Sequence, residues 1–209
     1  MTQTPDSIDS SIRHIPLSPD GFAIVDADMF EELSKHRWQN NHGCAMRAGV
    51  VDGRKKTIKM HRVVIGAEDS QLVDHINRIR HDNRRANLRI CTRSQNAHNQ
   101  SKSKIPTSSK YKGVSLFAKR NVWIAKIGKP GNNSTRHLGV FKNEIAAALA
   151  YNKAAKEQFG DFACLNSISD EEAAIALAEE NGPKIEAAIQ LLGENGYTVL
   201  KAFEQKGDG

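Results

Sequence analysis

The stretch LVDHINRIRHDNRRANLRICTRSQNAHN, residues 72–99, decides the fold and the chemistry of this chain. It combines an Asp74-His75 pair with two later amides, Asn87 and Asn96. An imidazole with an ordinary pKa of about 6.5 is partly neutral at physiological pH and can deprotonate an attacking water. A carboxylate and an amide oxygen are ligands for a hard cation such as Mg²⁺, and phosphate oxygens and water would complete the shell. These residue types suit hydrolysis of a phosphodiester.

Local patterns in this stretch predict a strand, a loop, a second strand and a helix. Residues 72–76 and 88–91 are short apolar runs, and the basic segment 77–87 between them is typical of a loop. Thr92-Arg-Ser-Gln95 has the S/T-x-x-E/Q form of a capping box, which predicts a helix that begins at Thr92.

Each polar residue of the stretch has an expected place. His75 alone could be a buried structural histidine, but the adjacent carboxylate of Asp74, on the opposite face of a regular strand, favours a catalytic role. Asn96 would point back at this strand from the first turns of the helix and supply a second metal ligand. Asn87 would brace the loop by tying it to the backbone near His75.

The charge distribution indicates a polyanionic partner. The formal net charge is +6, but residues 1–166 carry 27 Lys/Arg and 15 Asp/Glu, whereas residues 167–209 carry 3 and 9. Between Asp82 and Glu144 there are 14 Lys/Arg and no acidic residue. A merely solvated surface normally mixes both signs, so this segment is typical of a nucleic-acid-binding protein. The negative sign of the tail argues against direct DNA contact there.

Composition argues against several other classes of protein. The cysteines Cys44, Cys91 and Cys164 include no C-x-x-C pair, which argues against a structural zinc site or a disulfide framework. The N-terminus has no apolar signal-peptide segment, and no stretch is long enough to span a bilayer. We therefore expect a protein of the reducing cytoplasm without a membrane partner.

The rest of the chain predicts further structured regions joined by polar segments. Residues 1–20 are typical of a flexible arm, and residues 100–110 of a basic linker that can lie along a phosphate backbone. We expect one domain at 21–99, a second at 111–166 and an acidic helical tail at 167–209. The remaining expected strands are 22–25, 44–51, 57–60, 112–116, 122–128 and 136–141, and Asp52-Gly53 is the hairpin-turn signal that joins 44–51 to 57–60. The expected helices are 27–35, 144–159 (capped by Asn143), 169–181 and 183–193.

Residues 22–99 resemble the HNH, or ββα-metal, nucleases, specifically the group found in phage intron-encoded and free-standing homing endonucleases. The motif VDHIN…DNRRANLRICTRSQN carries the resemblance. It implies a ββα-metal domain that holds one Mg²⁺ or Mn²⁺ ion. The implied roles are general base for His75, metal ligands for Asp74 and Asn96, and structural Asn for Asn87. The wider family often has His at the third motif position, and an amide there favours Mg²⁺ or Mn²⁺ over a metal that prefers imidazole.

Residues 110–166 look like the APETALA-two/ethylene-response-factor DNA-binding domain of plants. The resemblance runs through Tyr111-Lys-Gly-Val-Ser, Trp123-Ile-Ala-Lys-Ile and His137-Leu-Gly-Val-Phe. It implies a three-stranded antiparallel sheet laid in the DNA major groove, with one helix packed behind it. Ser115, Gly128 and His137 stand where the plant family carries Arg or Trp, so the plant target sequence is not expected here.

Strand alternation assigns the two faces of that sheet. Trp123, Ala125 and Ile127 should face the helix, which leaves Lys126 on the DNA side. Trp123 could instead stack on a base, although its spacing favours the core.

The expected DNA contacts extend over both domains. His61, which precedes Arg62 in a pattern that matches the homing group, would either lie near the scissile bond or serve packing or phosphate contact. The predicted DNA-binding residues are Arg62, Arg78, Arg80, Arg84, Arg85, Arg93, Lys102, Lys104, Lys112, Ser115, Phe117, Lys119, Arg120, Lys126, Thr135 and His137.

The sequence thus predicts an α+β protein in which a ββα-metal nuclease domain precedes a three-stranded sheet with one packed helix and a small helical tail. We expect a monomeric, metal-dependent, site-selective endonuclease of the homing type that acts on double-stranded DNA. One base and one metal ion hydrolyse one strand, so nicking is expected.

One alternative is a non-catalytic DNA-binding regulator on the same fold. Another is an RNA-processing nuclease, against which the major-groove reader argues. The acidic tail would contact another protein or the chain itself.

Overall fold

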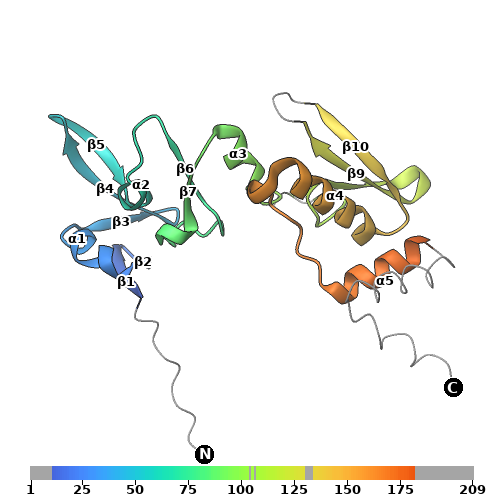
Figure 1. The fold of residues 1–209 in the computed structure, drawn as a ribbon, viewed down its shortest axis with the longest axis horizontal. Helices are drawn as coiled ribbons and strands as arrows, with labels where there is room; N and C mark the ends of the chain where they lie inside the picture. Colours follow the sequence, from blue (N-terminus) through green and yellow to red (C-terminus); the bar gives the residue numbers. More distant parts are fainter. Residues whose placement is uncertain (1–10, 104, 106, 130–133, 182–209) are drawn as a thin grey trace, which may run out of the picture. The chain divides into compact units, whose positions relative to one another are not determined.

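The computed structural model describes residues 11–103, 105, 107–129 and 134–181, and the chain divides into two compact units (Figure 1). Unit 1 comprises residues 1–100, and unit 2 comprises residues 101–209. Both combine strands with helices, so the predicted mixed α+β class is confirmed. Within the described ranges, no helix is both long and apolar enough to cross a membrane.

Unit 1 is built on a five-stranded sheet. Its first elements are β1 (Ile12–Ser18), β2 (Phe22–Asp26), η1 (Ala27–Met29), α1 (Phe30–Ser34), β3 (Trp38–Asn41), β4 (Cys44–Val51), β5 (Arg54–Lys59) and α2 (Met60–Ile65). The strand order is β2-β1-β3-β4-β5, and only β1 and β3 pair in parallel within this sheet as described. Asp52 and Gly53 both adopt positive φ between β4 and β5, as the predicted tight hairpin requires.

The prediction of a flexible arm through residue 20 is wrong for residues 12–18, which form β1. Ile15 and Leu17 are buried, whereas Pro16 between them is exposed. Apolar residues at alternate positions bury one face of a strand as soon as neighbouring strands are available, and β2 and β3 supply them. The first ten residues of the predicted arm lie outside the described part of the chain.

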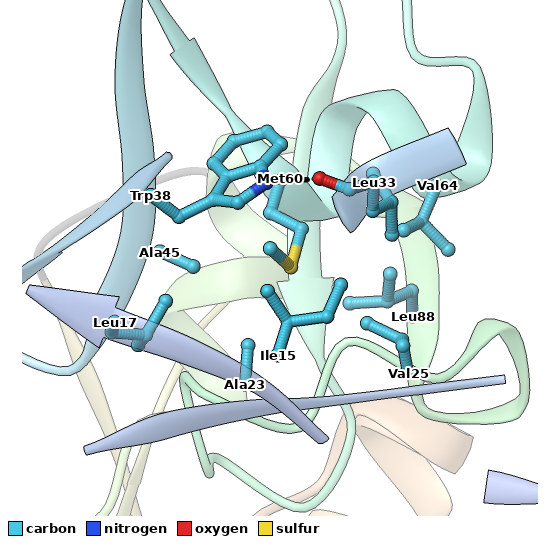
Figure 2. Packing of buried hydrophobic residues seen from close by; sticks show 10 residues of the cluster. All are labelled: Ile15, Leu17, Ala23, Val25, Leu33, Trp38, Ala45, Met60, Val64 and Leu88. Atoms are coloured by element: carbon cyan, nitrogen blue, oxygen red, sulfur yellow. Dashed lines mark hydrogen bonds between the residues drawn. The ribbon is translucent and has the colours of Figure 1, made fainter. Parts of the chain in front are cut away.

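One apolar cluster joins the sheet to its two short helices (Figure 2). Trp38 of β3 is buried, and its Nε1 donates to the backbone O of Leu33 in α1 over 2.8 Å. Met60 enters the cluster from α2, and Leu88 enters it from the following strand pair. Burial of each such large side chain stabilises the fold by about 1.5–3 kcal/mol, so the cluster anchors α2 and this strand pair to the sheet.

The stretch 72–99 forms two antiparallel strands followed by a helix, close to the predicted boundaries. These elements are β6 (Leu72–His75), η2 (Arg85–Asn87), β7 (Leu88–Cys91) and α3 (Arg93–His98). The register places Asp74 opposite Arg89. The predicted capping box is present, since Thr92 Oγ1 accepts from the backbone N of Gln95 and Gln95 Oε1 accepts from that of Thr92.

Unit 2 contains the predicted three-stranded sheet and its helix. Its elements are β8 (Val114–Phe117), η3 (Ala118–Arg120), β9 (Val122–Gly128), β10 (Thr135–Phe141), α4 (Glu144–Phe159), η4 (Gly160–Phe162) and α5 (Asp170–Asn181). The antiparallel strands lie in the order β10-β9-β8, and α4 covers one face. Asn143 caps α4 as predicted, because its side chain accepts from the backbone N of Ile145 and Ala146. Ala147 and Ala155 are fully buried, which lets the helix approach the sheet closely.

The acidic helix α5 contacts the start of α4. Glu180 Oε2 accepts from the backbone N–H groups of Lys142 and Asn143 over 2.8 and 3.1 Å, and Glu179 Oε2 accepts from Asn143 Nδ2 over 2.6 Å. Negative charge near a helix N-terminus is stabilised by the helix dipole. This part of the tail therefore contacts the chain itself, while the helix predicted at 183–193 lies outside the described residues.

Candidate functional site

The Asp74-His75 pair ends β6, and both side chains are buried, with 6% and 9% of their surface exposed. Asn99, directly after α3, contacts Asp74. His61 of α2 packs edge-on against the His75 ring, with 5.1 Å between ring centroids. These different neighbours agree with the expectation that the two side chains leave opposite faces of the strand.

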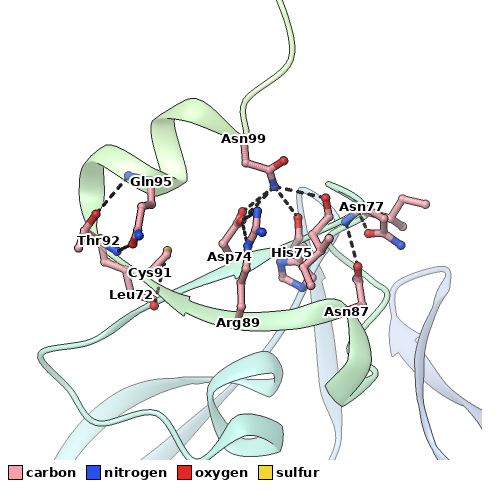
Figure 3. Close-up of polar contacts among 12 residues, drawn as sticks. Leu72, Asp74, His75, Asn77, Asn87, Arg89, Cys91, Thr92, Gln95 and Asn99 are labelled. Carbon is pink, nitrogen blue, oxygen red and sulfur yellow. Dashed lines mark hydrogen bonds and ion pairs between the residues drawn. The ribbon is translucent and has the colours of Figure 1, made fainter. Parts of the chain in front are cut away.

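The carboxylate of Asp74 is held by two side chains from different elements (Figure 3). Arg89 of β7 donates to Oδ2 from Nε and Nη2 over 2.9 and 2.8 Å, and the pair is largely buried. Asn99 Nδ2 donates to Oδ1 over 3.0 Å and to Oδ2 over 2.9 Å. Charge-assisted bonds of this length are strong, so the orientation of the carboxylate is fixed.

The environment of His75 favours a neutral ring. Burial lowers its pKa, and the polar contact with the Asn83 side chain together with the negative charges of Asp74 and Asp82 opposes that shift in part. His75 Nε2 is buried and makes no hydrogen bond of standard geometry with any residue that the structure describes. A neutral imidazole is a candidate proton acceptor.

His61 is neutral for the same reason. Burial, followed by the charges of His75 and Lys59, lowers the pKa of His61 to about 4. Its Nδ1 lies 3.8 Å from Sγ of Cys44. The structure thus gives His61 a packing contact beside His75, and contact with a scissile bond stays a prediction.

Asn87 braces the loop between β6 and β7 in the way its position predicts. Its Oδ1 accepts from the backbone N of Asn77 over 2.9 Å, and its Nδ2 donates to the backbone O of Asp82 over 2.8 Å. Its backbone O accepts from Ile76 N over 2.9 Å. These bonds fasten the chain immediately after His75 to the far end of the loop.

Asn96 is placed differently from Asn99. It is half-buried in α3, its backbone N donates to Thr92 O over 3.0 Å, and the amide that lies against Asp74 is that of Asn99. The role of Asn96 as a metal ligand stays a prediction.

The donor chemistry of the site fits a hard divalent cation. Asp74 offers carboxylate oxygens, and Asn99, directly after α3, places its amide against them. Nowhere in the described ranges do three or more His, Cys, Asp or Glu side chains gather to form a closed cage. Mg²⁺ is commonly held by one or two carboxylates, with waters and substrate phosphates completing its shell, so a partial protein shell is sufficient.

Several of the predicted DNA-binding arginines of unit 1 have partners within the protein. Arg62 donates to the backbone O of residues 67, 68 and 71. Arg84 pairs with Asp82 over 2.7 Å, and Arg85 pairs with Asp28 over 2.7 Å. The bonds of Arg62 hold the segment that follows α2, and those of Arg84 and Arg85 hold the loop between β6 and β7. DNA contact stays a prediction for all three. Arg78, Arg80 and Arg93 are exposed.

Five predicted DNA contacts of unit 2 lie together on the face of the sheet opposite α4. The register pairs Lys126 with His137, Ser115 with Ile124 and Thr135 with Gly128. Ala125 and Ile127, the alternate residues of β9, are buried against α4, and Trp123 packs against the same core, which confirms the predicted faces. The five exposed residues are Ser115, Phe117, Lys126, Thr135 and His137.

The remaining basic candidates of unit 2 have varied environments. Lys119 and Arg120 are exposed on η3, next to the sheet. Lys112 is half-buried, and its backbone N donates to Asn166 Oδ1 over 2.6 Å. Lys102 donates to the backbone O of Tyr111 over 2.8 Å, and burial lowers its pKa. Lys104 lies outside the described residues.

Two side chains of the site were not singled out from the sequence. Asn99 follows Asn96 by three residues, a spacing that puts both amides on one side of a helix. This spacing could have indicated from the sequence that Asn99 faces the same strand as Asn96. Asp82 is the lone carboxylate of the basic loop and is 2% exposed. Its hydrogen bond with Arg84 lowers its pKa, and Asn77 adds a bond of 2.8 Å, so it organises the loop from inside.

Comparison with known proteins gives two findings. The sequence pattern of the family described as HNH endonuclease matches residues 59–98, which include α2, β6, β7 and α3. An uncharacterized HNH endonuclease of Acanthamoeba polyphaga mimivirus is 31% identical over 156 residues, covering 70% of this chain and 75% of that protein.

Proposed function

The chain belongs to the HNH endonuclease family, and on that premise we propose that it is a metal-dependent, site-selective DNA endonuclease of the homing type. The observation that carries the proposal is the buried Asp74-His75 pair, held by Arg89 and Asn99 within the region that matches the family. A buried carboxylate next to a neutral imidazole suits hydrolysis, because one can hold a cation while the other accepts a proton.

His75 would act as the general base. Burial lowers its pKa, so the ring is neutral at pH 7 and able to take a proton from the attacking water. Asn87 would keep His75 in place through its bonds to the loop and to the backbone after β6.

Asp74, with Asn96 as the predicted second ligand, would hold the divalent cation on which HNH nucleases generally depend. When bound, such a cation stabilises negative charge on the phosphate oxygens, including the leaving oxygen. Oxygen and amide donors favour Mg²⁺ or Mn²⁺ for this position.

Unit 2 would supply much of the target recognition. Support comes from its exposed sheet face, where Lys126, Thr135 and His137 lie opposite the packed helix, and from its resemblance to the APETALA-two/ethylene-response-factor domain. A sheet of this width fits the DNA major groove. Phosphate contacts by lysines and arginines would supply affinity and register, while groove contacts would supply sequence preference.

We propose that the monomer nicks double-stranded DNA, since one base and one cation act on one phosphodiester. The test is incubation of supercoiled plasmid with Mg²⁺ and wild type, His75→Ala or His36→Ala. His36 is an exposed histidine of the same unit and serves as the matched control. We expect open-circular product from wild type and His36→Ala, and none from His75→Ala. Linear product would refute nicking, and cleavage by His75→Ala at the wild-type rate would refute the assigned base.

A further inference from the structure

The amide of Asn99 occupies a central place in the site (Figure 3). The residue is the C-cap that directly follows α3, and it is 4% exposed. Its Nδ2 lies 3.0 and 2.9 Å from the two carboxylate oxygens of Asp74 and 2.9 Å from the backbone O of His75. A single NH₂ group therefore contacts both the carboxylate and the backbone of the next residue.

The surroundings fix which end of this amide faces the strand. The neighbours of the amide are acceptors, namely the Asp74 carboxylate and the backbone O atoms of His75 and, at 3.4 Å, Ile76. An amide NH₂ has two hydrogens and an amide oxygen has none, so only the nitrogen end satisfies these contacts. Asn99 thus acts as a donor that ties Asp74 to the strand carrying His75.

Arg89 and Asn99 share the carboxylate between them. Arg89 donates to Oδ2, whereas Asn99 also reaches Oδ1. Because the two donors come from β7 and from the end of α3, they restrict the rotation of the Asp74 side chain from different elements. A carboxylate restricted in this way has less freedom to lose when it binds a cation.

The same bonds also position α3. Asn99 anchors the C-terminal end of this six-residue helix to β6, and the capping box of Thr92 and Gln95 secures its start. Asn96 lies between these two anchors and three residues before Asn99, on the same side of the helix. The distance from Asn96 to Asp74 therefore depends on the Asn99 anchor.

We propose that Asn99 is a positioning residue for divalent-cation binding, which orients the Asp74 carboxylate and holds α3 so that both predicted ligands converge. The inference rests on the proposed role of Asp74 as a cation ligand. It assigns Asn99 no contact with the reacting atoms, so its loss should weaken cation binding and leave the chemical step intact once the cation is bound.

The test uses the full chain and Mn²⁺ as the probe. Mn²⁺ affinity is measured without DNA, by electron paramagnetic resonance of the free ion, for wild type, Asn99→Ala and Gln100→Ala. Gln100 is the exposed neighbouring amide and gives the matched control. We expect Asn99→Ala to bind Mn²⁺ at least about tenfold more weakly, as for other residues that orient metal ligands, and Gln100→Ala to match wild type. Unchanged Mn²⁺ affinity in a folded Asn99→Ala protein overturns the proposal.

The cleavage rate measured against Mn²⁺ concentration separates positioning from a purely structural role. Positioning predicts that saturating Mn²⁺ restores the rate of Asn99→Ala to near the wild-type value. A rate that stays low at saturation, with a lowered melting temperature, overturns it. Asn99→Gln retains an amide and keeps the test available should the alanine variant fail to fold, and it should also bind Mn²⁺ more weakly than wild type. If wild type binds Mn²⁺ but cleaves no DNA, the proposed function fails, whereas the affinity comparison still decides the role of Asn99.

Discussion

Replacing Gly113 with alanine should destabilise unit 2 by about 2–5 kcal/mol, the sum of a backbone cost and a packing cost. Gly113 has a φ of +77°, where an L residue loses about 1–2 kcal/mol. A Cβ at this position would lie 2.0 Å from Cδ2 of Tyr151 and 2.7 Å from the backbone O of Lys126. Tyr151 is buried, so relieving the overlap requires overpacking that costs about 1–3 kcal/mol. The backbone O of Gly113 accepts from Lys126 N over 2.8 Å, so displacement of Gly113 should also displace Lys126. Because Lys126 is a predicted DNA contact, DNA binding should weaken as well.

Native-state hydrogen exchange of the full chain can measure this loss on amides of β9 and α4, with amides of unit 1 as an internal reference. Gly128→Ala is the matched control in the same sheet, because nothing lies within 4 Å of its Cβ position. Gly66→Ala isolates the backbone cost, since its φ is +65° and its Cβ position is also open; this variant is read on amides of unit 1, with unit 2 as the reference. A Gly113→Ala protein whose unit 2 stability stays within about 0.5 kcal/mol of wild type would refute the steric reasoning.

Three further predictions concern charge. Lys126→Ala should reduce the slope of log binding constant against log salt concentration by about 1 in duplex-DNA titrations, and an unchanged slope would remove Lys126 from the interface. Unit 1 should lose stability as the pH falls from about 6.5 to about 4, because His61 has a pKa of about 4 when folded and the unfolded chain takes up the proton first. His61→Gln should flatten that part of the pH dependence in urea denaturation, and an unaltered curve would contradict the assignment. Arg89→Met should lower the free energy of unfolding by about 3–5 kcal/mol, because it leaves the buried Asp74 carboxylate without the guanidinium that pairs with it. Adding Asp74→Asn should recover most of this loss, whereas additive losses in the double variant would argue against the ion pair.

Local signals were sufficient for most of the elements. The capping box at Thr92, the Asn143 cap of α4 and the Asp52-Gly53 turn each act within a few residues, and each is present as predicted. Alternation along β9 likewise predicted the two faces of the unit 2 sheet, because side chains of a strand alternate whatever lies around them. The segment before residue 20 has only Ile15 and Leu17 in alternation, which is too short a pattern to predict a strand, and their burial depends on strands contributed by later parts of the chain.

The residues of the site divide in the same way. The sequence by itself determined that Asp74 and His75 are adjacent on a strand, that an amide at Asn87 closes the loop and that the surroundings are basic. Only the tertiary structure decided that Arg89 and Asn99 converge on the Asp74 carboxylate and that His61 packs against His75. These contacts join residues 14 to 25 positions apart. Hydrogen bonds and ring contacts at such separations depend on strand register and on where a helix ends, which no local propensity specifies.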